Sequence, residues 1–255
     1  MTEATRHTPG TPCWVSLMVH GLEATQAFYG ELFGWEFSPG PQQLGPYVRA
    51  LIDGNEVAGI GRLPVDRHLP TAWTPYLATD DADVTAEAVR SCGGTVGVGP
   101  LDAGDAGRMA IVTDLAGAVF GLWQPAAHAG TALHGTHGTP VWNELLTTET
   151  PSVTKFYQAV FGYDAKPDGD PGEDRVTLCL DGRPVAALHG VPSRTRERGS
   201  HWMTWFEVED PDMTARQITR LGGQVLEPPA DGPHGRLARV ADPEGAVFTI
   251  VRSLR

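Results

Sequence analysis

The chain has 255 residues and a formal net charge of −12 at pH 7, from 31 acidic and 19 basic side chains. An acidic chain is repelled by phosphate groups, which disfavours nucleic acid and anionic membrane surfaces as partners. Hydrophobic residues make up 41% of the chain, enough for a packed core. No apolar run approaches the roughly 18 residues that a membrane-spanning helix needs.

The N-terminal segment lacks the charged-then-apolar order of a secretory signal, so we expect a cytoplasmic protein. Three cysteines, Cys13, Cys92 and Cys179, are spaced like neither a zinc site nor a disulfide framework. These features predict a protein that handles a small molecule or another protein.

Strand and helix signals alternate along the first half. Trp14–Val19 is apolar and carries β-branched residues, which predicts a strand. A helix is expected over about Glu23–Phe33, and Gly34 ends it. Further along, the same signals predict the strands Val48–Ile52 and Val57–Ile60 around an Asp-Gly turn, the strand Trp73–Thr79, the helix Val84–Cys92, and the strands Met109–Thr113 and Val119–Trp123.

The second half repeats the first. Phe28-Tyr29 recurs as Phe156-Tyr157, at an offset of 157 − 29 = 128 residues, and Asp114–Phe120 recurs as Asp242–Phe248 at the same offset. In the second copy Thr150 and Pro151 occupy positions typical of a helix N-cap and a first helical residue. The order of signals therefore predicts two βαβββ units in each half.

The repeat also sets the predicted domain boundaries. We expect an N-terminal tail over 1–11, a first domain over 12–124, a linker over 125–139 and a second domain over 140–253. The linker is rich in Gly, Ala, His and Thr without periodicity, which is typical of a surface connection. Its histidines, His128, His134 and His137, are interpreted as solvated residues without a role.

These motifs together resemble the vicinal oxygen chelate superfamily, which includes glyoxalase I, extradiol dioxygenases and bleomycin-resistance proteins. The resemblance rests on the F-Y-x-x-x-F-G-W/Y helix and the D-x-x-G-x-x-F segment, present in both copies. It implies an α+β fold of two tandem domains. Each domain would hold two βαβββ modules that curl an antiparallel sheet around a cup.

Enzymes of this family hold a divalent metal in the cup through His, Glu or Gln. Carried onto this sequence, the ligand positions fall on Trp14, Gly121, Trp142 and Thr249, with Thr74 and Met203 nearest the remaining two. Indole, glycine and threonine do not assemble such a site, so we predict no metal and no cofactor. One alternative stays open, in which Glu144, His189 and His201 gather in the second domain.

Aromatic residues at the ligand positions suggest a different use of the cups. Trp14 and Ser16 share one strand face, as do Trp142 and Glu144. Aromatic pockets with a few polar groups suit planar ligands. Some of these tryptophans could equally be ordinary core residues. The predicted ligand-binding residues are Trp14, Ser16, Trp73, Trp123, Trp142, Trp202, Trp205 and Thr249.

Glu144 stands out because its counterpart is Ser16, so the fold does not require a carboxylate there. With His189 or His234 it could perform general acid–base chemistry. The alternative interpretation is a carboxylate bonded to a nearby backbone group or arginine.

Three functions follow. The leading hypothesis is metal-independent binding of a small aromatic or polyketide-like metabolite, as in antibiotic sequestration or self-resistance. Its rival is a cofactor-free isomerase, lyase or cyclase that uses Glu144 with His189 or His234. The third is a metal-dependent glyoxalase or dioxygenase. A monomer or a homodimer fits each of them.

Overall fold

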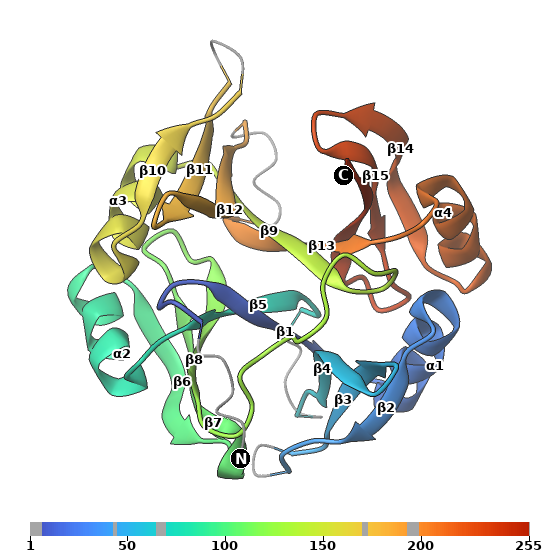
Figure 1. Cartoon of the computed structure of the whole chain (residues 1–255), viewed down its shortest axis with the longest axis horizontal. Helices are drawn as coiled ribbons and strands as arrows, with labels where there is room; N and C mark the ends of the chain where they lie inside the picture. Colours follow the sequence, from blue (N-terminus) through green and yellow to red (C-terminus); the bar gives the residue numbers. More distant parts are fainter. Residues whose placement is uncertain (1–6, 43–44, 65–69, 170–172, 193–198, 255) are drawn as a thin grey trace. The chain divides into compact units, whose positions relative to one another are not determined.

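The computed structural model describes residues 7–42, 45–64, 70–169, 173–192 and 199–254. These residues form four βαβββ modules in chain order (Figure 1). Module 1 is β1 (Pro12–Val19), α1 (Leu22–Phe33), β2 (Glu36–Pro39), β3 (Tyr47–Ile52) and β4 (Asn55–Arg62). Module 2 is β5 (Trp73–Ala78), α2 (Ala82–Ser91), β6 (Thr95–Asp102), β7 (Gly107–Thr113) and β8 (Val119–Pro125), with the short helix η1 (Gly104–Ala106) before β7.

The second half repeats this order. Module 3 is β9 (Pro140–Thr147), α3 (Thr150–Phe161), β10 (Asp164–Pro167), β11 (Arg175–Leu180) and β12 (Arg183–Gly190). Module 4 is β13 (His201–Glu207), α4 (Pro211–Arg220), β14 (Gln224–Gly232), β15 (Gly235–Ala241) and β16 (Val247–Ser253). The predicted α+β fold of two tandem pairs of βαβββ modules is confirmed.

Helix ends follow local chemistry with one departure from prediction. Gly34 and Gly162 end α1 and α3 in the left-handed conformation, at φ of 70° and 72°, which glycine adopts without steric cost. The predicted N-cap at Thr150 is wrong by one position. Glu149 is the N-cap, and the Thr150 hydroxyl instead donates a hydrogen bond to the Asp174 carboxylate at 2.8 Å.

The strands form two mixed sheets, with the orders β2-β3-β4-β1-β5-β8-β7-β6 and β10-β11-β12-β9-β13-β16-β15-β14. Within each module the later strands pair antiparallel, whereas the first strand pairs parallel with the last, as β1 does with β4. The sheets are therefore mixed rather than wholly antiparallel. This parallel pair brings the start of each module next to its end.

The modules group into two compact units. Unit 1 comprises Met1–Trp14, Thr74–Gly130 and Asn143–Met203, and unit 2 comprises Val15–Trp73, Thr131–Trp142 and Thr204–Arg255. Unit 1 thus contains most of modules 2 and 3, with α2 beside α3, and unit 2 most of modules 1 and 4, with α1 beside α4 (Figure 1). The predicted boundaries at 12–124 and 140–253 describe the repeat, and as domain boundaries they stay a prediction.

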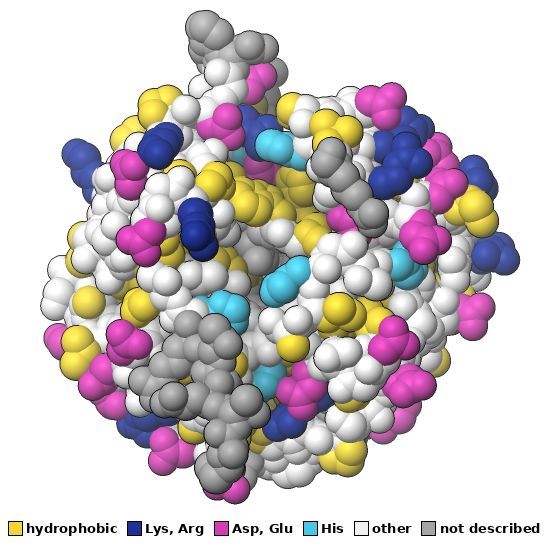
Figure 2. Space-filling view, in the orientation of Figure 1, with side chains coloured by type: hydrophobic (Ala, Val, Ile, Leu, Met, Phe, Trp, Pro, Cys, Tyr) yellow, Lys and Arg dark blue, Asp and Glu magenta, His cyan; other side chains and the backbone are white. Residues whose placement is uncertain are grey.

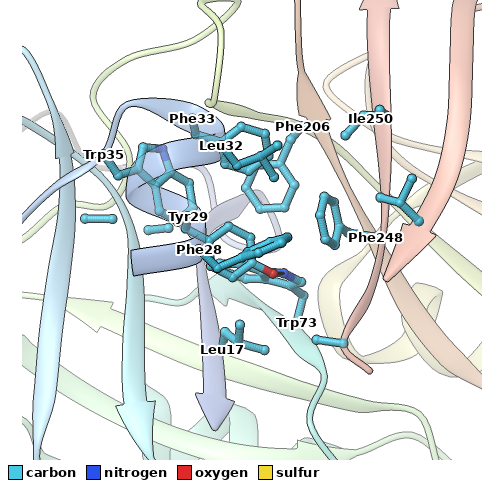
Figure 3. Close-up of a cluster of buried hydrophobic side chains, with 14 of the residues drawn as sticks. Leu17, Phe28, Tyr29, Leu32, Phe33, Trp35, Trp73, Phe206, Phe248 and Ile250 are labelled. Carbon is cyan, nitrogen blue, oxygen red and sulfur yellow. Dashed lines mark hydrogen bonds between the residues drawn. The ribbon is translucent and has the colours of Figure 1, made fainter. Parts of the chain in front are cut away.

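The core of unit 2 is built around Tyr29 of α1 (Figure 3). Its ring stacks on Trp35 at 5.3 Å and meets Trp73 edge to face at 5.5 Å. The Trp73 indole N–H donates to the Tyr29 hydroxyl at 3.1 Å, and that hydroxyl donates to the Asp242 carboxylate at 3.0 Å. A buried chain of polar groups therefore runs through an otherwise apolar core.

Unit 1 contains the same chain of groups. The Trp202 indole donates to the Tyr157 hydroxyl at 3.0 Å, and Tyr157 donates to Asp114 at 3.3 Å. Trp73 and Trp202 are thus core residues with satisfied N–H groups, on the side of the sheet that packs against the helices. This placement argues against the ligand-binding role predicted for both, because neither indole is available to a ligand.

The helices of the described residues are short or polar. None of them is long and apolar enough to cross a membrane.

Candidate functional site

Each module has a helix-facing side and an opposite side, here called its open face. In module 3 Leu145 of β9 and Leu188 of β12 pack in the core with α3. Because side chains alternate along a strand, Trp142, Glu144 and Leu146 lie on the open face. His189 and Arg175 share that face, since Leu146 is aligned with His189 and His189 with Arg175.

Glu144 is the centre of a polar cluster on this open face. Its Oε1 accepts a hydrogen bond from the Arg175 guanidinium at 3.0 Å and lies 3.6 Å from Nδ1 of His189. The Glu144 side chain is 6% exposed, that of Arg175 16% and that of His189 38%. A nearly buried ion pair therefore lies beside an imidazole that solvent or a ligand can reach.

Sequence reasoning found part of this cluster. Glu144 and His189, which were predicted to act together, lie within 3.6 Å of each other, and the hydrogen bond from Arg175 corresponds to the alternative interpretation of a carboxylate bonded to an arginine. Arg175 was missed, although the repeat offset places it at the counterpart of Tyr47 (47 + 128 = 175). His201 does not join them through its Nδ1, which lies 2.9 Å from the Gly199 carbonyl.

Module 1 carries a different set at the same positions. Ser16, Tyr47 and Gly61 are the counterparts of Glu144, Arg175 and His189. The Ser16 and Tyr47 hydroxyls are hydrogen-bonded at 2.7 Å. A β-carbon at Gly59 would collide with the Tyr47 ring, so this ring lies directly on the strand. Tyr47 thus fills the open face of module 1, and Ser16 is engaged by the protein itself.

The open face of module 2 is also filled from within the chain. Tyr76 lies on Gly121, where a β-carbon would collide with its ring. Trp14 and Trp123 are buried beside it, 6% and 7% exposed. His128 meets Trp14 edge to face at 4.5 Å, and its carbonyl accepts from the Trp123 indole at 2.8 Å.

This packing changes two interpretations made from the sequence. Trp14 and Trp123 are held by His128 and by the small cluster around Tyr76, which gives them a structural role in module 2. His128 and His137 are not solvated linker residues. His128 packs on the two indoles, and His137 accepts from the Glu209 backbone N–H at 3.3 Å.

Module 4 keeps a polar open face, as module 3 does. Trp205, Thr249 and Arg239 are aligned across β13, β16 and β15. Arg239 is paired with Glu227 at 2.8 Å, and the exposed His234 lies 5.8 Å from Trp205, ring to ring. His234 belongs to unit 2, whereas the Glu144 cluster belongs to unit 1.

The residues at the family's metal positions do not fit a metal. Gly121 lies under Tyr76, and Trp14 is packed against His128. Glu144 is bonded to the permanently charged guanidinium of Arg175, which would repel a divalent cation. Among the described residues, no group of three or more His, Cys, Asp or Glu is placed to hold a metal ion.

Two matched arginines serve the fold. Arg108 bonds Asp83 at 2.8 Å and Asp102 at 2.8 Å, and Arg236 likewise bonds Asp212 and Asp231. The hydrogen bond from Arg108 lowers the pKa of the Asp83 carboxyl. Each arginine thus ties its hairpin to the first turn of a helix.

On the face of the molecule that Figure 2 shows, basic side chains are interspersed among acidic ones.

Two family models match the sequence. One described as "Glyoxalase-like domain" matches residues 144–251, and one described as "Bleomycin resistance protein-like N-terminal" matches residues 12–48. Among curated proteins, "Putative glyoxylase CFP32" of Mycobacterium tuberculosis is 36% identical over 263 residues, covering 99% of this chain and 98% of that protein. "Anthracycline biosynthesis protein DnrV" of Streptomyces peucetius is 36% identical over 266 residues, covering 97% and 94%.

Solved structures agree on the fold. The Mn(II)-bound glyoxalase from Novosphingobium aromaticivorans superimposes with a TM-score of 0.67 at 17% identity, covering 97% of this chain and 84% of that one. The 2,3-dioxygenase LapB from Pseudomonas sp. KL28 gives 0.64 at 16% identity, covering 98% and 94%. The chain therefore belongs to the vicinal oxygen chelate superfamily, as a tandem protein of its glyoxalase-like and bleomycin-resistance-like members.

Proposed function

We propose that this protein binds a small, planar, oxygen-rich metabolite of the aromatic polyketide type, without a metal, through the Glu144–Arg175–His189 cluster. The observation that carries the proposal is a difference between two modules at matched positions. Module 1 has the hydrogen-bonded hydroxyl groups of Ser16 and Tyr47, whereas module 3 has a charged pair. Ser16 and Tyr47 satisfy each other, whereas Glu144 and Arg175 lie beside a reachable imidazole.

The chemistry of the cluster suits such a ligand. Arg175 offers N–H donors, Glu144 an acceptor, and His189 either role according to its tautomer. A hydroxyl next to a ring carbonyl presents a donor and an acceptor side by side, as the cluster does. Trp142, half-buried on the same face two residues before Glu144, offers a flat apolar surface for a ring.

The names of two groups of relatives support this proposal. The Streptomyces proteins named for anthracycline biosynthesis match over 97% of this chain, and the first strand and helix match a bleomycin-resistance-like model. One name concerns the biosynthesis of a natural product and the other concerns resistance to one. A sequestering or self-resistance protein of secondary metabolism is the biological form that we propose.

The test is calorimetric titration with a dihydroxyanthraquinone. We expect the wild type to bind about one equivalent at this cluster. Because charge-assisted hydrogen bonds contribute roughly 1.5–3 kcal/mol, the double variant Glu144→Gln/Arg175→Met should bind about 10- to 100-fold more weakly. Removing both partners together avoids a buried unpaired charge, which would otherwise threaten folding.

The matched control is the counterpart pair in module 1. Ser16→Ala/Tyr47→Phe removes both hydroxyl groups there and should leave the affinity within twofold. Equal losses in both double variants, or no loss in the module 3 variant, would contradict the assignment of the site.

A second function is favoured by the 3.6 Å separation of Glu144 Oε1 and His189 Nδ1. The two groups could pass a proton to and from a carbon next to a carbonyl, as an isomerase, lyase or cyclase requires. If so, product analysis shows turnover by the wild type. Glu144→Gln should then abolish turnover and keep the affinity within a few fold, whereas an unchanged rate would rule this function out.

A further inference from the structure

The open face of module 4 holds a buried hydrogen-bond donor that has no acceptor among the residues that the structure describes. Trp205 is 6% exposed, and its indole Nε1 has no hydrogen-bond partner among the described residues. By contrast, the core tryptophans Trp73 and Trp202 each donate to a tyrosine hydroxyl. An orphaned buried donor costs about 1–3 kcal/mol, so it calls for a physical reason.

Neighbouring residues extend this donor into a polar strip. Thr249 lies next to Trp205 on β16 and is 3% exposed, and Arg239 lies next to Thr249 on β15. Arg239 donates to Glu227 through one terminal nitrogen, while its buried Nε has no partner among the described residues. Two buried N–H donors thus flank Thr249 on one face.

The repeat shows that folding does not require this strip. At the same positions module 2 carries Tyr76 (205 − 129), Gly121 (249 − 128) and Ile111 (239 − 128), and the Tyr76 ring fills the space over Gly121. Thr249 stands at the position of Gly121, and its side chain would occupy the space that the Tyr76 ring fills in module 2. Module 4 therefore presents donors where module 2 presents packed apolar surface.

We propose that the Trp205 indole N–H, with Arg239 Nε beside Thr249, forms a recognition site for a carbonyl oxygen of a planar quinone-type ligand. This inference rests on the proposed function and assigns to module 4, within unit 2, a separate site for the same class of ligand. The Arg239 charge is offset by Glu227, so the strip favours a neutral carbonyl over a carboxylate. The imidazole of His234, which meets the Trp205 ring edge to face, could also contact a ring of the ligand.

The experiment compares two probes of the same shape. One is 1-hydroxyanthraquinone, and the other is anthracen-1-ol, which has no ring carbonyl. Calorimetry is performed with the wild type, with Trp205→Phe, which keeps a ring but removes the N–H, and with the control Tyr76→Phe at the matched position of module 2. At the module 4 site we expect Trp205→Phe to weaken quinone binding about five- to 50-fold and anthracenol binding less than twofold. Tyr76→Phe should change neither.

A spectroscopic readout avoids reliance on the variant's folding. In ¹⁵N-tryptophan-labelled wild type, the quinone should shift the Trp205 indole proton downfield, and anthracenol should leave it in place. Equal losses for both probes in Trp205→Phe, or an unmoved Trp205 resonance with bound quinone, overturns this inference and leaves the proposed function standing. A wild type that binds neither probe overturns both.

Discussion

The Tyr29 hydroxyl donates a hydrogen bond of 3.0 Å to the Asp242 carboxylate, although the two residues are 213 positions apart in the chain. Tyr157 and Asp114 repeat this contact in the other compact unit. Each aspartate also accepts backbone N–H groups of its own turn, as Asp242 does from Glu244 and Ala246. The two repeated motifs F-Y and D-x-x-G-x-x-F are therefore hydrogen-bonded to each other in a buried network of each unit.

The first prediction concerns the stability that this network supplies. Tyr29→Phe leaves the Trp73 N–H and one Asp242 oxygen without a partner in a buried setting. We expect the free energy of unfolding to fall by about 1–3 kcal/mol, and Tyr157→Phe to cost a similar amount. Urea unfolding followed by circular dichroism measures both. An unchanged midpoint and slope in either variant would contradict the role given to the hydroxyl.

The second prediction concerns pH. Burial raises the pKa of the Asp242 carboxyl, and the same cause raises the pKa of Asp114. A raised folded-state pKa means that the folded protein binds the proton more tightly, so this stabilisation is present at low pH and is lost as pH rises through the folded-state pKa. Relative to Asp242→Asn, which does not titrate, the wild type should therefore gain stability as pH falls from 7 toward 4.

Urea midpoints of the wild type and Asp242→Asn, taken at each pH unit, measure this difference. The control is Asp53→Asn, which removes a carboxyl group at an exposed turn outside the buried network. A difference between wild type and Asp242→Asn that moves the other way would show that the carboxylate is stabilised, not penalised, by its surroundings.

Most of the fold could be predicted from local sequence patterns. The repeat offset, the strand alternation and the glycines after α1 and α3 depend on neighbouring residues, and they predicted the modules and the open face that carries Glu144. The parallel pairing of β9 with β12 then places His189 near Glu144. These are consequences of register, which sequence spacing encodes.

The rest depends on contacts that spacing does not encode. Nothing in the local pattern of Trp73 indicates that its N–H points to Tyr29, and nothing near His128 indicates that it covers Trp14 and Trp123. The role of Arg175 could have been found, because the repeat aligns it with Tyr47 and an arginine replacing a ring signals a changed environment.

The third prediction tests whether the Tyr47 ring fills the open face of module 1. Gly59→Ala places a methyl group where the Tyr47 ring lies, and should destabilise the protein by about 1–3 kcal/mol. Adding Tyr47→Ser removes the collision, so Gly59→Ala should cost much less in that background. Gly97→Ala is the control, because a β-carbon there meets only ordinary contact distances. Equal costs for Gly59→Ala in both backgrounds would contradict the packing described.

The fourth prediction converts module 3 into the chemistry of module 1. Glu144→Ser, Arg175→Tyr and His189→Gly install the counterpart residues of module 1. Ala187→Gly is added because Ala187 is the counterpart of Gly59 (59 + 128 = 187), where the absence of a β-carbon leaves room for the Tyr47 ring. Because module 1 folds with this set, the fourfold variant should unfold at a urea midpoint close to that of the wild type. It should also lose binding of the dihydroxyanthraquinone by at least about tenfold, since the charged donors and acceptor are gone. Omitting Ala187→Gly should lower the midpoint, because the new tyrosine ring would then strike a β-carbon. A well-folded fourfold variant that binds as the wild type does would show that the Glu144 cluster is structural and that the ligand is recognised elsewhere.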